Sequence, residues 1–115
     1  MPVLDRTVSF FARRVLARFD AASRDPVAAQ RAVLRNLIQA AGETCWGRAV
    51  GLAEISSPEE FATRVPLMRY EQAATWWHQA FEGQHNVMWP GHVHFFALSS
   101  GTTAGNKLLP VTADG

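Results

Sequence analysis

The fold is decided by one stretch near the C-terminus, Phe95-Phe96-Ala97-Leu98-Ser99-Ser100-Gly101-Thr102-Thr103-Ala104-Gly105-Asn106-Lys107-Leu108-Leu109-Pro110-Val111-Thr112. Two apolar runs enclose a polar run that contains two glycines. This pattern predicts strands at about Val93–Leu98 and Lys107–Thr112, joined by a connection from Ser99 to Asn106. The stretch is therefore expected to form a β-hairpin with a polar loop at its tip.

The connecting loop is rich in hydrogen-bond donors and carries a positive charge. Hydroxyl groups, glycines that let the backbone come close, and a lysine ammonium are what the oxygens of a polyphosphate require. We predict a phosphate-binding loop made of Ser99, Ser100, Gly101, Thr102, Thr103, Gly105 and Lys107. The loop is not a Walker A motif, a Gly-x-Gly-x-x-Gly turn or a nucleophile elbow. The alternative is an ordinary surface loop, in which the same residue types are common.

The run Ser99-Ser100-Gly101-Thr102-Thr103, followed by Lys107, resembles the phosphate-binding signature of the adenylate-forming superfamily. From about Trp46 to Thr112 the chain is similar to one branch, the auxin-responsive promoter family of acyl-acid amido synthetases. The other motifs that carry this similarity follow the order of that family: Trp46-Gly47-Arg48, Gly51-Leu52, Phe61, Arg64-Val65-Pro66-Leu67, Tyr70-Glu71, Trp89-Pro90-Gly91, Phe96-Ala97-Leu98 and Pro110-Val111-Thr112.

The resemblance implies a ligase that uses ATP and Mg²⁺ to activate a carboxylic acid. Such an enzyme forms an acyl-adenylate, releases pyrophosphate, and passes the acyl group to the amine of an amino acid with release of AMP. The alternatives are an acyl-CoA ligase, whose acceptor is the coenzyme A thiol, and a non-catalytic helical remnant. The resemblance places the superfamily's Mg²⁺-binding residue, ribose-binding acidic residue and C-terminal-domain lysine beyond residue 115. We therefore assign no catalytic residue and no metal ligand in this chain.

At 115 residues, the chain is several times shorter than the complete enzyme that the resemblance implies. We interpret the chain as an α+β fragment, with N-terminal helices followed by a β-hairpin that carries the phosphate-binding loop. Residues 1–115 are expected to be part of a single, incomplete N-terminal domain of an adenylate-forming enzyme, with no internal boundary. A two-stranded hairpin is marginally stable alone, so the fragment is expected to be inactive and poorly stable.

Four helices are predicted before the hairpin: about Pro2–Asp20, Pro26 to Gly42, Ser57-Pro58 to just before Val65-Pro66, and Arg69–Glu82. Apolar residues at steps of three and four indicate the first helix. Asp25 is expected to cap the second helix, which has Pro26 in its first turn. The capping-box pattern Ser57-Pro58-Glu59-Glu60 opens the third helix, and Gly83 ends the fourth.

The formal net charge of +1 gives no electrostatic reason to expect binding to nucleic acid or to an anionic membrane. Charges interrupt the short apolar stretches near the N-terminus, so neither a secretory signal nor a membrane span is predicted. The single cysteine, Cys45, excludes a disulfide within the chain and fits a cytoplasmic location. Beside Trp46, it is expected to be a packed thiol rather than a nucleophile.

Histidines and large aromatic residues near the hairpin suggest two further hypotheses. His92 and His94 share a face of the predicted strand and could begin a zinc site with His78 and His85, but no zinc-binding spacing supports this. We expect edge or partly buried histidines and no metal. Four aromatic side chains could line a substrate pocket, although they are expected to fill core or an interdomain seam: Trp76, Trp77, Phe81 and Trp89.

Overall fold

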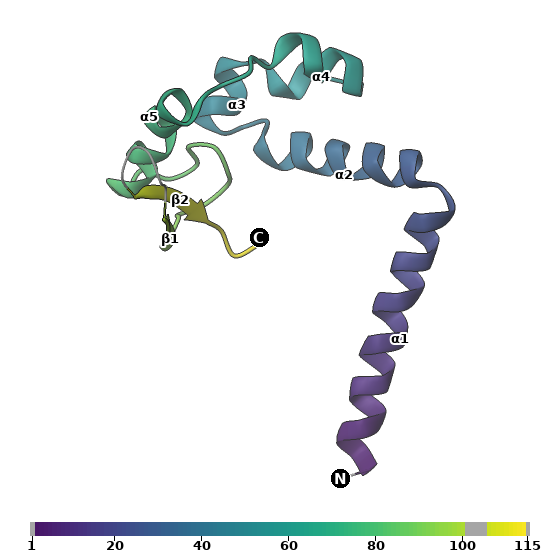
Figure 1. Ribbon diagram of the computed structural model, residues 1–115. Coiled ribbons are helices and arrows are strands. Elements are labelled where there is room, and N and C mark those ends of the chain that lie inside the picture. The colour runs from purple at the N-terminus through teal and green to yellow at the C-terminus, as the bar shows by residue number, and fades with distance from the viewer. Residues whose placement is uncertain (1, 101–105, 115) are drawn as a thin grey trace. The chain divides into compact units, whose positions relative to one another are not determined.

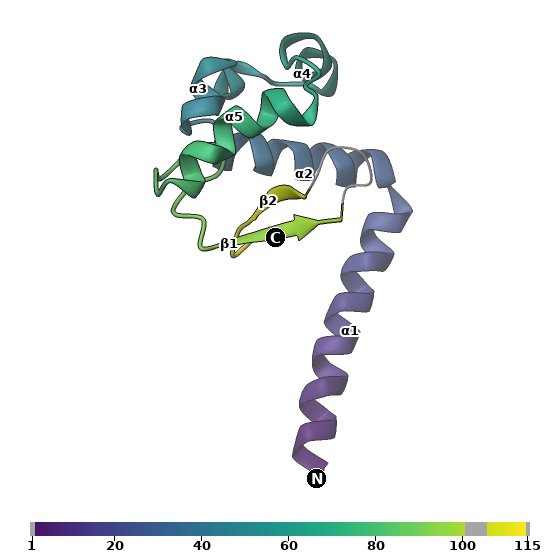
Figure 2. The same ribbon diagram turned by 60° about the vertical axis from the view of Figure 1, so that its left-hand side comes forward.

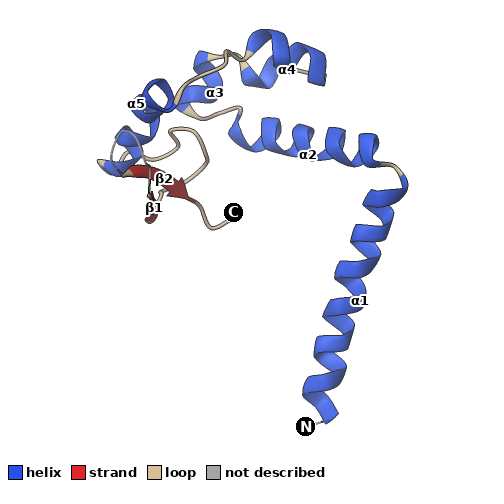
Figure 3. Ribbon diagram, in the orientation of Figure 1, coloured by secondary structure: helices blue, strands red, loops and turns tan. Residues whose placement is uncertain are grey.

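The computed structural model describes residues 2–100 and 106–114, with side chains described from Arg6 onward (Figure 1). The chain forms two compact units, residues 1–34 and residues 35–115. Helices precede a β-hairpin, as the colouring by secondary structure shows (Figure 3). The predicted order of helices and hairpin is confirmed. No helix in the described ranges combines the length and the apolar character that crossing a membrane requires.

Helix α1 spans Pro2–Arg24, so the predicted end near Asp20 is about one turn too early. Two alanines follow Asp20 and favour helix. The Ser23 hydroxyl then donates to the Phe19 carbonyl at 2.8 Å, a bond made within the helix rather than one that ends it.

Helix α2 spans Pro26–Ala41 and confirms both predicted ends. The Asp25 carboxylate accepts a hydrogen bond from the Ala28 amide at 3.0 Å, which satisfies one of the free amides of the first turn. Pro26 begins the helix at a position where its missing N–H costs nothing.

Two short helices follow that the sequence analysis did not predict, α3 (Cys45–Ala49) and the 3-10 helix η1 (Leu52–Glu54). Thr44, with only 1% of its surface exposed, joins α2 to α3. Its hydroxyl donates to the Ala41 carbonyl at 2.6 Å and accepts from the Gly47 amide at 3.0 Å. A Cβ at Gly47 would lie 2.0 Å from the Ala41 carbonyl oxygen, so this turn requires glycine.

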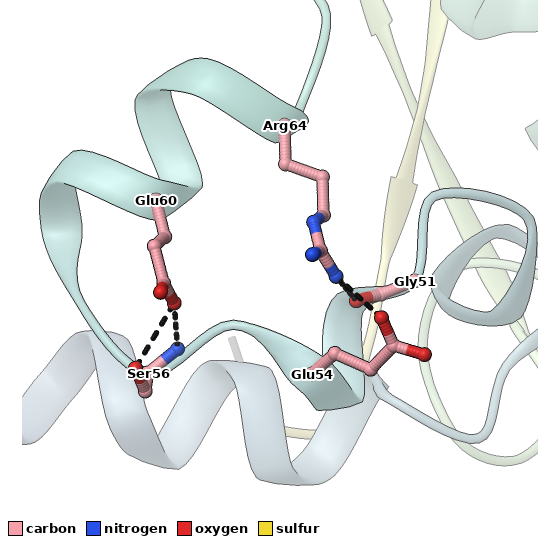
Figure 4. A network of polar contacts seen from close by, with 5 residues as sticks. All are labelled: Gly51, Glu54, Ser56, Glu60 and Arg64. Atoms are coloured by element: carbon pink, nitrogen blue, oxygen red, sulfur yellow. Dashed lines mark hydrogen bonds and ion pairs between the residues drawn. The ribbon is translucent and has the colours of Figure 1, made fainter.

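Helix α4 spans Pro58–Arg64, as predicted. The Ser57 hydroxyl accepts from the Glu60 amide at 3.1 Å, which is one half of the predicted capping box. The other half differs from the prediction. The Glu60 carboxylate accepts from the amide of Ser56 at 2.7 Å and from its hydroxyl at 2.9 Å, one residue before the cap (Figure 4).

The C-terminal end of α4 is connected to the turn around η1 by Arg64. Its guanidinium donates to the Gly51 carbonyl at 3.3 Å and to the Glu54 carboxylate at 2.7 Å (Figure 4). Gly51 has a φ of 65°, in the left-handed region that favours glycine. The side chain of Arg64 is 43% exposed and that of Glu54 is 76% exposed, so water screens the ion pair and it adds little stability. The bond to the Gly51 carbonyl is what fixes the geometry of the turn.

Helix α5 spans Tyr70–Phe81, within one residue of the prediction at each end. Gly83 follows with a φ of 99°, as expected of a C-terminal stop. The amides of Cys45 and Trp46, at the start of α3, donate to the carbonyls of Asn86 and Val87 at 2.9 Å, which connects α3 to the segment before the hairpin. The buried apolar residues of the described chain are few: Ile38, Ala41, Leu52, Ile55, Ala74, Ala80 and Val87.

The hairpin consists of β1 (Phe95–Ser99) and β2 (Lys107–Val111), paired antiparallel with Phe95 opposite Val111. Strand β1 begins two residues later than predicted, and β2 ends one residue earlier. The hairpin lies beside α5 in both views (Figures 1 and 2). The rings of Phe96 and Phe81 meet edge to face with centroids 5.2 Å apart, so α5 covers this face of the hairpin at Phe96.

The opposite face of the hairpin is apolar and exposed. Successive strand residues point to opposite faces, so Phe95 lies away from Phe96 and on the same face as its partner Val111. Leu109 shares this face. We call Phe95, Leu109 and Val111 the outer face; their side chains are 74%, 42% and 41% exposed.

Candidate functional site

The two ends of the predicted phosphate-binding loop lie opposite each other at the tip of the hairpin. Ser99, the last residue of β1, pairs with Lys107, the first residue of β2, and we call this pair the loop base. Both residues are half-buried, whereas Ser100 and Asn106 are exposed. The connection therefore begins at Ser100, one residue later than predicted, because Ser99 belongs to the strand.

The predicted site residues in the middle of the loop are Gly101, Thr102, Thr103 and Gly105, and they lie outside the described residues. Their role in binding phosphate stays a prediction. The described strands on both sides agree with the expected order of strand, connection and strand.

Lys107 lies against the aromatic ring of Tyr70, the first residue of α5. The ammonium nitrogen of Lys107 is 5.0 Å from the centroid of the ring, a distance typical of a cation–π interaction. Lys107 is also the only lysine of the sequence. The lysine predicted to meet phosphate is thus placed at the loop base by a contact with a helix.

The hydroxyl of Tyr70 makes two hydrogen bonds to the residue after Lys107. It accepts from the Leu108 amide at 2.9 Å and donates to the Leu108 carbonyl at 3.2 Å. The ring of Tyr70 also contacts the ring of Trp77, about two turns along α5, with centroids 5.4 Å apart. The sequence analysis noted Tyr70 only as part of a family motif and did not predict this contact.

Three histidine rings gather before the hairpin. The Nδ1 atoms of His92 and His94 are 3.3 Å apart, and the ring of His85 lies 4.8 Å from that of His92, centroid to centroid. The argument from a shared strand face was wrong, because β1 begins only at Phe95. All three histidines are exposed, and no trio of histidine, cysteine or carboxylate side chains in the described ranges is arranged to hold a metal ion.

Two of the four predicted aromatic residues, Trp77 and Trp89, line one small apolar pocket together with Val87 and Pro110. Its volume of about 40 Å³ holds a water molecule or two but no organic substrate. Phe81 instead contacts Phe96 on the hairpin. These side chains therefore pack the junction between α5 and the segment around the hairpin.

Cys45 does not match its expected environment. The side chain is exposed rather than packed, and its Sγ accepts a hydrogen bond from the Gln84 side-chain amide at 3.4 Å. The residue begins α3, whose buried side is formed by Gly47, so the thiol is left facing outward.

The profile of the GH3 family N-terminal domain matches residues 15–115, which include every described part of the candidate site. The chain belongs to the GH3 family. This confirms the resemblance to the auxin-responsive acyl-acid amido synthetases. A curated GH3 relative, the jasmonoyl-L-amino acid synthetase GH3.3 of Oryza sativa subsp. japonica, is 30% identical over 94 residues.

That alignment covers 81% of this chain and 20% of the rice protein. The chain thus spans about a fifth of the length of the relative that it matches. No solved structure matches the chain.

Proposed function

We propose that this chain is the N-terminal part of an ATP-dependent acyl-acid amido synthetase of the GH3 family. The observation that carries the proposal is the match of residues 15–115 to the N-terminal domain of that family. The loop base supports it, because the hairpin brings Ser99 and Lys107 together at the two ends of a loop rich in hydroxyls and glycines.

In the proposed reaction, a carboxylate oxygen of the acid attacks the α-phosphorus of ATP, and the bond to pyrophosphate breaks. The amine of an amino acid then attacks the acyl carbonyl carbon, loses a proton, and displaces AMP. The main electrostatic demand of the first step is the negative charge on the phosphate oxygens. The loop holds the β- and γ-phosphates during this step, with Lys107 as the positive charge.

ATP enters this reaction as its Mg²⁺ complex, which neutralises part of the phosphate charge. The described part of the chain gathers no three histidine, cysteine or carboxylate side chains that could hold a metal ion. We assign no Mg²⁺ ligand to this segment, and the proposed contribution of the chain is limited to hydrogen bonds and the Lys107 charge.

We favour an amino acid as the acceptor because the rice relative is, by its name, a jasmonoyl-L-amino acid synthetase. The coenzyme A alternative has no such support. A cytoplasmic location belongs to the same proposal, since the one cysteine leaves no disulfide within this chain.

The test is the Lys107→Ala variant of the full-length enzyme, meaning the product of the complete reading frame that contains this chain. Loss of a charge-assisted hydrogen bond of roughly 1.5–3 kcal/mol is expected to raise the KM for ATP in pyrophosphate exchange about tenfold to hundredfold. The KM for the carboxylic acid should not change, because the charge meets phosphate and not the acyl group.

The control is Arg69→Ala, which removes an exposed cation beside Tyr70 but outside the loop. An unchanged dependence on ATP in the Lys107 variant would refute the phosphate assignment. Sequencing the gene beyond codon 115 distinguishes the enzyme from the non-catalytic remnant. A native stop codon there would favour the remnant.

A further inference from the structure

The geometry points to Tyr70 as a positioning residue that holds Lys107 at the loop base through its hydroxyl and its ring. This inference rests on the proposed function, since it concerns the lysine that we expect to bind phosphate. Tyr70 acts on the reaction only through Lys107. It contacts β2 and Lys107, and we assign it no contact with a substrate.

The two hydrogen bonds of the Tyr70 hydroxyl fix the backbone directly beside Lys107. Both the N–H and the C=O of Leu108 are used, at 2.9 Å and 3.2 Å. In an antiparallel pair these two groups of one residue point to the same edge, so the hydroxyl occupies the place that a further strand would take. Pro110, two residues on, presents no N–H at this edge. Of the two β2 residues that face this edge, Leu108 is therefore the one that offers both an N–H and a C=O.

The ring of Tyr70 adds a second constraint, on the side chain of Lys107. The ammonium lies 5.0 Å from the ring centroid, and the ring is itself packed against Trp77 at 5.4 Å. A phosphate oxygen attracts an ammonium more strongly than an aromatic ring does, because charge-assisted hydrogen bonds are the stronger interaction. The ring thus keeps Lys107 in place while the loop is empty and releases it to a polyphosphate.

The two roles can be separated on the present chain by NMR. Since Lys107 is the only lysine, its ε-methylene signal is assigned without ambiguity, and the ring should shift that signal upfield. Tyr70→Phe keeps the ring but loses both hydrogen bonds, so the upfield signal should remain while the Leu108 amide exchanges faster. Tyr70→Leu should lose both features. An equally protected Leu108 amide in Tyr70→Phe would overturn the anchoring.

The functional arm uses the full-length enzyme and the pyrophosphate exchange assay. We expect Tyr70→Phe to raise the KM for ATP about tenfold and to leave the KM for the carboxylic acid unchanged. In the Lys107→Ala background the same change should have little further effect, because Tyr70 acts through Lys107.

The matched control is Phe81→Leu. It weakens a different contact between α5 and the hairpin, the one made to Phe96 on β1, and it does not alter the contacts of Tyr70 with Lys107 and Leu108. A merely structural role for Tyr70 predicts that both variants change the KM for ATP alike, and that result would overturn the inference. If Lys107→Ala raises this KM and Tyr70→Phe does not, the positioning role alone fails. If Lys107→Ala has no effect on this KM, the proposed function fails, and the positioning role that rests on it fails too.

Discussion

Glu60 is the residue whose ionisation the fold changes most clearly. The amide of Ser56, and then its hydroxyl, donate hydrogen bonds to the carboxylate and lower the pKa of Glu60 below its ordinary value of 4.5. The charge of Arg64 acts in the same direction to a smaller extent. Because the lowered pKa belongs to the folded state, the ionised Glu60 stabilises that state above about pH 4.5. This contribution is lost as the pH falls through the lowered pKa.

Glu60→Gln is expected to make the chain less stable than the unmodified chain at neutral pH, because a neutral amide accepts weaker hydrogen bonds than a carboxylate. The difference should shrink as the pH falls below about 4.5, where the carboxylate becomes protonated. Urea unfolding at neutral pH and at about pH 3 measures this. Ser56→Ala is the companion variant: it keeps the backbone amide and should retain part of the effect. A difference independent of pH would contradict the assignment.

At the scale of elements, the hairpin has one face that α5 covers at Phe96 and one face that is exposed. Phe95 and Phe96 are neighbours in β1 and differ only in which face they occupy. Phe96 contacts the ring of Phe81, whereas Phe95 is 74% exposed on the outer face. The two positions therefore form a matched pair in one strand.

Phe96→Ala is expected to destabilise the chain by about 1–3 kcal/mol, since it removes a ring contact and part-buried apolar surface. Phe95→Ala should change the free energy of unfolding by less than about 0.5 kcal/mol, as surface substitutions usually do. Urea denaturation followed by circular dichroism provides both values. Equal losses in the two variants would show that the outer face is covered in solution, for example by another copy of the chain.

The elements differ in how well the sequence predicted them. Helices α2, α4 and α5 have caps or stops that act locally, namely Asp25, Ser57 and Gly83, and their bounds were predicted within a residue or so. Helix α3 was missed because it is only 5 residues long and depends on the buried hydroxyl of Thr44 and on the close approach at Gly47. A period of 3.6 residues cannot be recognised in so short a segment.

The same distinction applies to the candidate site. Lys107 and Ser99 were predicted from a continuous pattern of residues in the loop. Tyr70 was not, because its hydroxyl meets Leu108 across a separation of 38 residues, and no local pattern encodes such a contact. The shared family motif was the only signal that pointed to Tyr70.

For the whole molecule, the small number of buried apolar residues limits the stability of the isolated chain. The outer face of the hairpin and large apolar side chains such as Phe81 remain exposed. Burying a side chain of this kind contributes about 1.5–3 kcal/mol, a large share of the roughly 5–15 kcal/mol that stabilise an ordinary domain. We therefore expect the isolated chain to be poorly stable.

The isolated chain of residues 1–115 is expected to show no pyrophosphate exchange with ATP and any carboxylic acid. It contains one predicted loop for phosphate and spans about a fifth of the length of its curated rice relative, so most of the enzyme is missing from it. The assay is run with the full-length enzyme as the positive control. Exchange that copurifies with the isolated chain and disappears in Lys107→Ala would contradict this expectation.

The bond between Tyr70 and Leu108 also bears on the order in which the chain folds during synthesis. A ribosome that adds about 5–20 residues per second needs roughly 2–8 s to pass from Tyr70 to Leu108, 38 residues later. A β-hairpin forms within microseconds once its strands exist. Translation therefore sets the sequence of events: α5 is made first, where the rings of Tyr70 and Trp77 can already meet, and the hairpin docks onto this helix later. Until the hairpin forms, the nascent chain leaves the Phe81 ring without Phe96 and the Tyr70 hydroxyl without Leu108.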